Sequence, residues 1–466
     1  MSIDSSRRDF LTRAGMGFGS LAAGSLLSGQ QPGRGGTAKS VISLFMHGGP
    51  SHLDTFDPKP LLNKMHGQLV PDSFGNVRLQ FSTFKERPIL GSSRKFARHG
   101  ASGLEISDVF PHLARHADKL AVIRSMNHDG FTHTAALNWL NNGWPRLGRP
   151  SMGSWVVYGL GSEAKNLPAF VVMLEGGIKS GPSVYSSGFL PALHQATTLR
   201  SSGSPILYAN RAEGVGETAQ RDMLDTLHWF NEKHQATRAD DTDLSARISA
   251  YELAFKMQIA VPELSDLSKE SSATKALYGM DSPATTEFGT RCLMARRLVE
   301  RGVRFVQLWS GTSTGEGDWD GHKGCEQNHI KQAAKTDKCV AGLLEDLAAR
   351  GLLDSTMVVW GGEFGRTPTS DGNANGGGDN LGRDHNPYGF SIWMAGGGIR
   401  GGKAIGSTDE IGLRAVQDPV HVHDLHASIL SMLGLDHEKL TFPFQGRDFR
   451  LTDVHGNTSL VAKLRA

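Results

Sequence analysis

The stretch "VISLFMHGGPSHLDTFDPKP", residues 41–60, joins an apolar run to a loop that carries His47, His52, Asp54 and Asp57. A run that is apolar at nearly every position indicates a strand buried on both faces, as in a mostly parallel sheet covered by helices. In such sheets, ligands bind beyond the carboxyl ends of the strands. The stretch therefore predicts a buried strand that ends at a polar site.

Similar apolar, β-branched runs recur along the chain and alternate with helical patterns. Apolar spacings of three and four predict helices over 244–259, 285–302 and 331–351, and Pro262 is expected to end the first. This alternation predicts an α/β fold with a mostly parallel, open sheet flanked by helices. The further strands are predicted at 120–125, 169–174, 303–309, 356–361 and 389–396.

The composition is that of a globular protein with glycine-rich loops. Of its 466 residues, 38% are hydrophobic and 21% are charged, and the net charge of +2 gives no basic excess for binding nucleic acid. Many of the 57 glycines cluster in loops, which suits a site built there. The stretches 176–204 and 262–287 are expected to be long loops. Three cysteines are too few for a disulfide framework, and we expect them to pack in the core.

The N-terminus, "SSRRDFLTRAGMGFGSLAAGSLLSG" at residues 5–29, resembles a twin-arginine export signal. Arg7 and Arg8 precede an apolar part shorter than the roughly 20 residues that cross a bilayer. We therefore expect residues 1–38 to be a targeting segment that engages the twin-arginine machinery and delivers the chain to the periplasm or another extracytoplasmic space. An uncleaved anchor stays an alternative. Residues 39–466 are expected to form a single domain without a stable membrane span.

Potential metal ligands follow or closely precede four of the predicted strands. A single His or Asp beside glycines is usually a turn residue, but four loops at one sheet edge predict a shared divalent ion. Imidazoles and carboxylates together suit zinc, manganese, calcium or iron. The candidate ligands are His47, His52, Asp54, Asp318, Asp320, His322, Glu363 and His385.

A second polar cluster, in "RSMNHDGFTHTAALNWLNNGWP" at residues 124–145, lies at the start of a predicted helix. Such a helix N-terminus can hold an anion. The hydroxyl of Thr132 or Thr134 could be a metal-activated nucleophile, and His133 could be a nucleophile or an acid/base group. The alternative is that Thr132 simply caps the helix. In a later run, the three histidines at 421, 423 and 426 are expected to be structural.

Seven strings in order identify a family resemblance from about residue 40 to the C-terminus. The chain resembles the exported bacterial, planctomycete-type family called domain of unknown function 1501, which is similar to alkaline phosphatases and sulfatases. The strings are "HGGPSHLDTFDPKP", "ARRLVERGVRFVQL", "DWDGH", "GGEFGRTP", "GRDHNP", "GGGIRGG" and "HDLHASILSMLG".

This resemblance implies an alkaline phosphatase-like domain with metal ions at the carboxyl ends of its strands. The first ligand position falls on the His47–Asp54 loop, and "DWDGH" supplies Asp318 and His322, with Asp320 equally well placed. Glu363 takes the place of a paired Asp, and the late His is His385.

The chain also departs from the wider group at several positions. His47 replaces an Asp, and Phe364 replaces the second member of the pair, so one metal site is expected to be missing. His133 falls near the nucleophile position, and the lack of C-x-P-S-R argues against a formylglycine sulfatase.

The resulting functional prediction is an exported, metal-dependent hydrolase of phosphate or sulfate esters. Its substrate would be a small anionic ester or a sulfated or phosphorylated glycan. Arg366 would steady the anion, and His128 or His133 would protonate the leaving group. The alternative is a catalytically silent binding or scaffold protein with the same fold.

Overall fold

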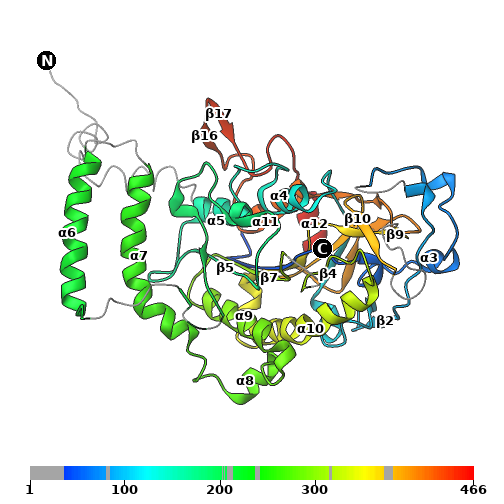
Figure 1. The fold of residues 1–466 in the computed structure, drawn as a ribbon, viewed down its shortest axis with the longest axis horizontal. Helices are drawn as coiled ribbons and strands as arrows, with labels where there is room; N and C mark the ends of the chain where they lie inside the picture. Colours follow the sequence, from blue (N-terminus) through cyan, green and yellow to red (C-terminus); the bar gives the residue numbers. More distant parts are fainter. Residues whose placement is uncertain are drawn as a thin grey trace.

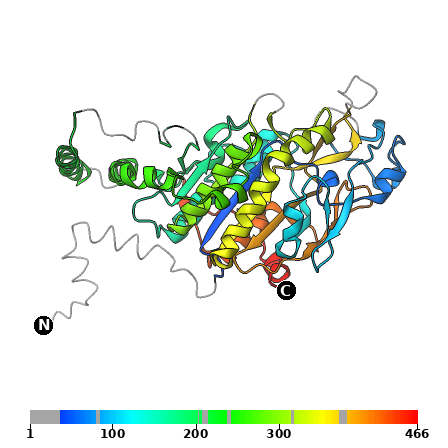
Figure 2. The same ribbon diagram turned by 90° about the horizontal axis from the view of Figure 1, so that it is seen from below.

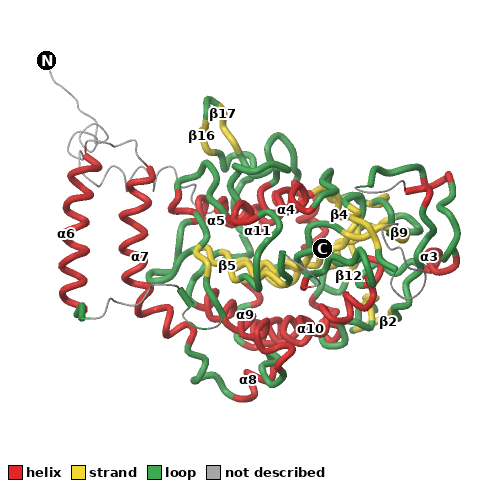
Figure 3. The backbone as a smooth tube through the Cα atoms, in the orientation of Figure 1, coloured by secondary structure: helices red, strands yellow, loops and turns green. Residues whose placement is uncertain are grey.

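A nine-stranded sheet crosses the centre of the molecule in the order β12-β4-β11-β8-β1-β7-β5-β6, with β15 beside β4, in this computed structural model (Figures 1 and 3). The structure describes residues 36–79, 84–201, 203, 205–206, 214–236, 242–313, 317–371 and 381–466. The predicted signal residues 1–35 lie outside these ranges. The strands are β1 (Ser40–Met46), β4 (Ala121–Asn127), β5 (Phe170–Met173), β6 (Thr197–Thr198), β7 (Phe305–Ser310), β8 (Thr356–Gly361), β11 (Phe390–Gly396), β12 (Lys403–Ile405) and β15 (Val420–His421).

The predicted α/β class is confirmed, and its helices cover both faces of the sheet. One face packs against α9 (Pro283–Glu300) and α10 (Cys325–Ala349), which lie beneath the strands in Figure 1 and in front of them in Figure 2. The other face packs against the helices α4 (His133–Asn142), α5 (Met152–Leu160) and α11 (Val422–Met432). Within the described residues, no helix combines the length and apolarity needed to cross a bilayer.

Strand β1 shows why its sequence is apolar at almost every position. Successive side chains of a strand point to opposite faces. Ile42 and Leu44 accordingly join the core beneath the sheet, whereas Val41 and Phe45 join the core above it. All four are buried, so both sets of alternating positions must be apolar.

The helical hairpin of α6 (Glu217–Ala236) and α7 (Thr242–Ser265) stands beside the sheet (Figure 1). The prediction that Pro262 ends the helix is wrong, because α7 continues to Ser265. The guanidinium of Arg297 donates to the carbonyls of Glu263 and Asp266, at 2.9 and 2.8 Å, and so satisfies groups in and just after the last turn.

The expectation of a long loop over 262–287 is also wrong. This stretch holds α8 (Ser272–Leu277), and α9 begins within it. Ser271 caps α8 by accepting a hydrogen bond from the Thr274 amide, and Pro283 lies in the first turn of α9, where its missing N–H costs nothing. The described residues of the 176–204 stretch form only short elements, as expected for a long loop.

Strand β11 runs antiparallel to both of its neighbours, β4 and β8, whereas β1 pairs in parallel with β7 and β8. The start of β11 therefore lies at the edge where β1, β7 and β8 end. The hairpin of β9 (Gly365–Ser370) and β10 (Arg383–Asn386) precedes β11 at that edge. The reversal of one strand thus gathers four loops, as the metal prediction requires.

Candidate metal centre

Four side chains converge at the sheet edge, two from the loop that follows β7, one from strand β10 and one from the start of helix α4. They are His133, Asp320, His322 and His385, and each offers a ligand atom within 4.8 Å of the others. The Nε2 atoms of His322 and His385 are 2.9 Å apart, and the Asp320 carboxylate lies 3.2 Å from His322 Nε2 and 2.9 Å from His133 Nε2. The structure thus brings together four of the predicted site residues.

Each of the three imidazoles is held at its other nitrogen. Nδ1 of His133 lies 2.7 Å from Glu363 Oε1, and Nδ1 of His322 lies 2.6 Å from Asp371 Oδ2. Nδ1 of His385 lies 2.9 Å from the carbonyl oxygen of Phe131. Acceptors at Nδ1 favour the tautomer whose Nε2 lone pair points away from them, which is how metal-ligating histidines are usually oriented.

This orientation provides a test of whether a cation fits. With Nδ1 protonated, His322 and His385 face each other through two Nε2 lone pairs, and neither can donate to the other. A cation between them removes that conflict. Three imidazoles and one carboxylate are a ligand set that suits zinc, manganese or iron.

Buried charges around the cluster keep its carboxylates ionised. Burial opposes ionisation of Asp320, but the neighbouring Arg366 guanidinium holds its pKa well below the usual range. The pKa of Glu363 is likewise lowered to about 2, against the effect of burial, by its hydrogen bond with His133. Burial lowers the pKa of His385 to about 3, so this imidazole is neutral at pH 7. Asp320 and His385 are thus in the states that bind metals, whereas the pKa of His133 is raised, against the effect of burial, by its contacts with Asp320 and Glu363.

Lys179 also reaches the cluster, and sequence reasoning did not identify it. Its ammonium lies 2.7 Å from Asp320 Oδ2, 3.1 Å from Asp318 Oδ2 and 3.0 Å from His133 Nε2. Lys179 comes from the glycine-rich loop that follows β5, a strand parallel to β7. The loop's place after a parallel strand was the signal that could have revealed this residue.

His47, Asp318 and Glu363 surround the cluster without belonging to the four-residue group. His47 is buried, and its Nδ1 lies 3.1 Å from the carbonyl oxygen of Thr312. Glu363 accepts hydrogen bonds from the Gly48 amide in addition to its contact with His133. These residues orient the ligands or the loops that carry them.

His52 and Asp54 lie in a different network. His52 Nε2 lies 2.8 Å from the carbonyl oxygen of Gly412. Asp54 pairs with Arg383 at 3.1 Å and accepts from the Ser51 hydroxyl at 2.5 Å. The predicted ligand set from this loop is therefore not brought together as a whole.

The predicted catalytic residues other than His133 make structural contacts. Thr132 caps α4 by accepting from the Ala135 amide, and Thr134 lies in the first turn of the same helix. His128 Nε2 contacts the carbonyl oxygen of Glu363 at 2.6 Å, and burial lowers the His128 pKa to about 4.

Arg366 is fully buried, and its guanidinium is already engaged. It donates to Asp320 at 2.7 Å and to the carbonyls of Gly48, Gly49 and Arg383. This geometry makes Arg366 a holder of Asp320. Lys179 is the better placed of the two cations to meet an incoming anion.

The histidines of α11 are structural, as predicted. His421 caps the helix, and Nε2 of His423 and of His426 lies 2.9 and 2.8 Å from the carbonyl oxygens of Gly143 and Leu140. The three cysteines are free and buried.

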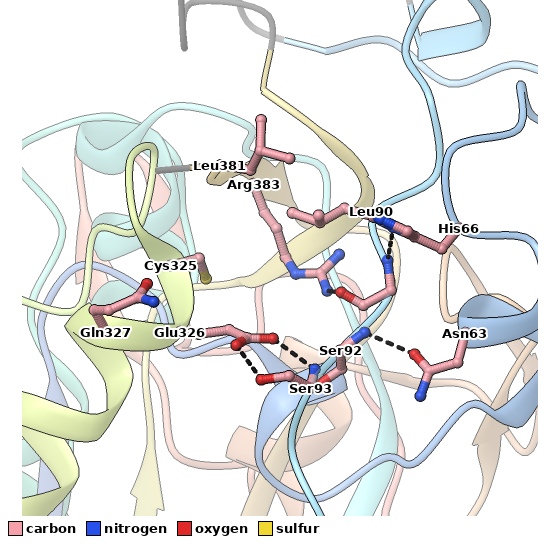
Figure 4. Close-up of a pocket in the computed structure, with 11 residues that line it drawn as sticks. Asn63, His66, Leu90, Ser92, Ser93, Cys325, Glu326, Gln327, Leu381 and Arg383 are labelled. Carbon is pink, nitrogen blue, oxygen red and sulfur yellow. Dashed lines mark hydrogen bonds between the residues drawn. The ribbon is translucent and has the colours of Figure 1, made fainter. Parts of the chain in front are cut away.

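A cavity of about 520 Å³ lies between α3 (Pro60–Lys64), the loop at Ser92 and the start of α10 (Figure 4). Its wall includes Arg383, whose guanidinium donates to Asp54, to the Thr367 carbonyl and to the Gly91 carbonyl. Glu326 binds the amide and hydroxyl of Ser93. None of the four clustered residues lines this cavity, so it is a separate space.

Comparison with solved structures finds distant similarity to a sulfatase, an alkaline phosphatase and a lipoteichoic acid synthase. The PsFucS1 sulfatase of Pseudoalteromonas sp. is 13% identical, with 96% of this chain and 74% of that chain covered and a TM-score of 0.38. The alkaline phosphatase of the Antarctic bacterium TAB5 is 12% identical, with 78% and 92% covered and a TM-score of 0.33. The lipoteichoic acid synthase LtaP of Listeria monocytogenes is 9% identical, with 92% and 80% covered and a TM-score of 0.35.

No curated protein matches the chain. A family model does match residues 38–461, almost the whole of the described structure, and confirms the resemblance found from the seven sequence strings. The chain belongs to the family described as "Protein of unknown function (DUF1501)".

Proposed function

We propose that this protein is an exported, metal-dependent hydrolase of phosphate or sulfate esters. The observation that supports it most is the convergence of three imidazole Nε2 atoms and one carboxylate, each imidazole being held at Nδ1. His133, Asp320, His322 and His385 would hold the ion. When bound, a divalent cation polarises an ester oxygen and makes a water molecule more acidic.

The two cationic side chains near Asp320, Arg366 and Lys179, have different roles in the proposed site. Arg366 fixes the Asp320 carboxylate from the buried side, at 2.7 Å. Lys179 contacts the same carboxylate from a more exposed position, with 22% of its side chain accessible. An ammonium on a flexible stem can turn from Asp320 toward an anionic ester, and it carries three donor hydrogens to do so.

Glu363 and His133 form the second functional pair. The Glu363 carboxylate faces His133 Nδ1, so Glu363 sets the direction of Nε2 and increases the basicity of the imidazole. Thr132 holds the same imidazole in place indirectly, because it caps the helix that His133 begins.

The test uses the purified full chain with p-nitrophenyl phosphate and p-nitrophenyl sulfate, first stripped of metal and then supplied with Zn²⁺, Mn²⁺ or Ca²⁺. We expect turnover that requires one of these ions and falls at least a hundredfold in Asp320→Asn and His385→Gln. The matched control is His426→Gln, a buried histidine outside the cluster.

The outcome that contradicts catalysis is a chain that binds metal tightly but hydrolyses neither ester. That result would favour the binding or scaffold protein. A chain that binds none of the ions would overturn the metal centre itself.

Export is part of the same proposal and is supported by the N-terminal Arg7-Arg8 pair and the short apolar stretch that follows. Cell fractionation tests it. We expect the wild-type chain in the extracytoplasmic fraction and the Arg7→Lys/Arg8→Lys chain inside the cell, and equal distributions of the two chains would contradict export by this route.

A further inference from the structure

Two buried carboxylates lie on the Nδ1 side of His322, away from the four-residue cluster. Asp371 directly follows β9 and is 2% exposed, and Asp384 lies in β10 and is 1% exposed. His322 Nδ1 is 2.6 Å from Asp371 Oδ2. One ligand atom from each of these three residues lies within 4.8 Å of the others.

One carboxylate oxygen of Asp384 is buried without a hydrogen-bond donor from the part of the chain that the structure describes. Its Oδ1 accepts from the His385 amide at 2.7 Å, but its buried Oδ2 has no hydrogen-bond partner among the described residues. Burying a carboxylate without a partner costs several kcal/mol. A group that approaches Oδ2 is therefore expected in the working protein.

The neighbouring guanidinium does not supply that group. The donors of Arg366 are directed at Asp320 and at the backbone carbonyls of Gly48, Gly49 and Arg383. The imidazole of His322 can carry only one proton at Nδ1, which Asp371 already faces. The Nδ1 proton that faces Asp371 does not reach Oδ2 of Asp384, which stays unpartnered within the described residues.

We propose that His322 Nδ1, Asp371 and Asp384 bind a second divalent cation, with His322 bridging two ions. This inference rests on the proposed function, because it assigns Nε2 of the same imidazole to the first ion. On binding, the Nδ1 proton passes to solvent, and the nitrogen lone pair that it leaves behind is donated to the second ion. One imidazole and two carboxylates suit Zn²⁺ or Mn²⁺.

The second ion would have a structural role at the metal centre and would not contact the substrate. Two ions that clamp one substrate oxygen lie about 3.5–4 Å apart. Ions on opposite nitrogens of one imidazole are separated by the ring and lie further apart. The second ion would instead tie the hairpin of β9 and β10 to the loop that carries His322, and so fix His322 for the first ion.

The competing interpretation needs no second ion. Asp371 would then accept the Nδ1 proton of His322, as an orienting carboxylate does, and Asp384 would bind a proton. The two interpretations differ in stoichiometry, because the competing one gives a single metal ion per chain.

The experiment loads the metal-free full chain with Zn²⁺ alone, or with Mn²⁺ alone, removes free metal by gel filtration and measures bound metal by elemental analysis. We expect two equivalents in the wild type, one in Asp384→Asn and one in His385→Gln. The control is Asp337→Asn, which alters another buried acid, one bound to the amides of His112 and Leu113, and should keep two equivalents.

Thermal unfolding without metal shows whether Asp384→Asn folds. Its melting temperature should equal or exceed that of the metal-free wild type, because a buried charge has been removed, while its upward shift with Zn²⁺ should be smaller.

The possible outcomes distinguish a failure of the second metal site from a failure of the proposed function. One equivalent in the wild type, unchanged in Asp384→Asn, overturns the second site and leaves the first intact. No bound metal in the wild type overturns the proposed function. Loss of both equivalents in Asp384→Asn also contradicts a separate second site.

Discussion

Asp320 is the residue on which the charges of the centre converge. Its carboxylate contacts Arg366 and Lys179, each at 2.7 Å, and His133 at 2.9 Å. Removing one partner of a buried pair leaves an uncompensated charge and typically costs about 3–5 kcal/mol. Arg366 has no exposed surface, so its contact with Asp320 is structural, whereas Lys179 is partly exposed and free to exchange one oxygen acceptor for another.

The first prediction at this scale concerns Lys179→Met. We expect KM for an anionic aryl ester to rise about tenfold or more, because a hydrogen bond to a charged group contributes about 1.5–3 kcal/mol. Bound metal should be unchanged. Steady-state kinetics and elemental analysis measure the two effects, and Lys335→Met, which removes the ammonium paired with Glu175 at 2.7 Å, is the control. An unchanged KM would show that Lys179 does not meet the substrate.

A second prediction concerns the carboxylate behind His133. Glu363→Gln keeps the size of the side chain but removes its charge, and we expect metal affinity to fall about 10–100-fold, the usual effect of changing a group that orients a ligand. Competition with a chelator measures the affinity, and Glu326→Gln in the neighbouring cavity is the control. An affinity equal to that of the wild type would mean that His133 is not a ligand.

Sequence reasoning could identify the four clustered residues because they adjoin strand ends or begin a helix. It could not separate them from His52 and Asp54, because the short helical turn His52–Asp54 leads these side chains toward Gly412 and Arg383. Spacing along the chain does not reveal that turn.

At the scale of elements, helix α4 delivers His133 to the centre as its first residue. Thr132 satisfies a free N–H of the first turn, and Gly143, in the left-handed conformation with φ of 64°, ends the helix. The direction of His133 therefore depends on a single cap as well as on Glu363.

The prediction that belongs to this helix compares Thr132→Ala with Thr132→Ser. Loss of the cap should lower the free energy of unfolding by about 1 kcal/mol, and serine, which keeps the hydroxyl, should retain most of it. Urea unfolding measures the difference. Loss of all turnover in Thr132→Ala with unchanged stability would instead identify the hydroxyl as a reacting group.

At the scale of the whole molecule, the sheet order was less predictable than its existence. Apolar runs predict where the strands lie in the sequence, but they do not indicate in which direction each strand runs in the sheet. Parallel neighbours usually need a helical crossover, and the segment between β8 and β11 carries the β9–β10 hairpin. The absence of a helical pattern between Gly361 and Phe390 was the available signal that β11 runs in the opposite direction.

Metal removal is the prediction for the molecule as a whole. A ligand that binds only the folded state at a hundredfold excess over its Kd stabilises that state by about 2.7 kcal/mol. We therefore expect a chelator to lower the melting temperature of the wild type by a few degrees and to lower that of Asp320→Asn by less. Calorimetry measures both, and equal responses would contradict a metal centre at Asp320.

The reversed strand β11 has a consequence for biosynthesis. His133 and His385 stand 252 positions apart (385 − 133), so most of the polypeptide must leave the ribosome before both exist. Even then, His385 reaches its partners only once β11 has inserted between β4 and β8. A nascent or truncated chain would lack a complete set of donors, and stable capture of the ion would mark a chain whose assembly is finished.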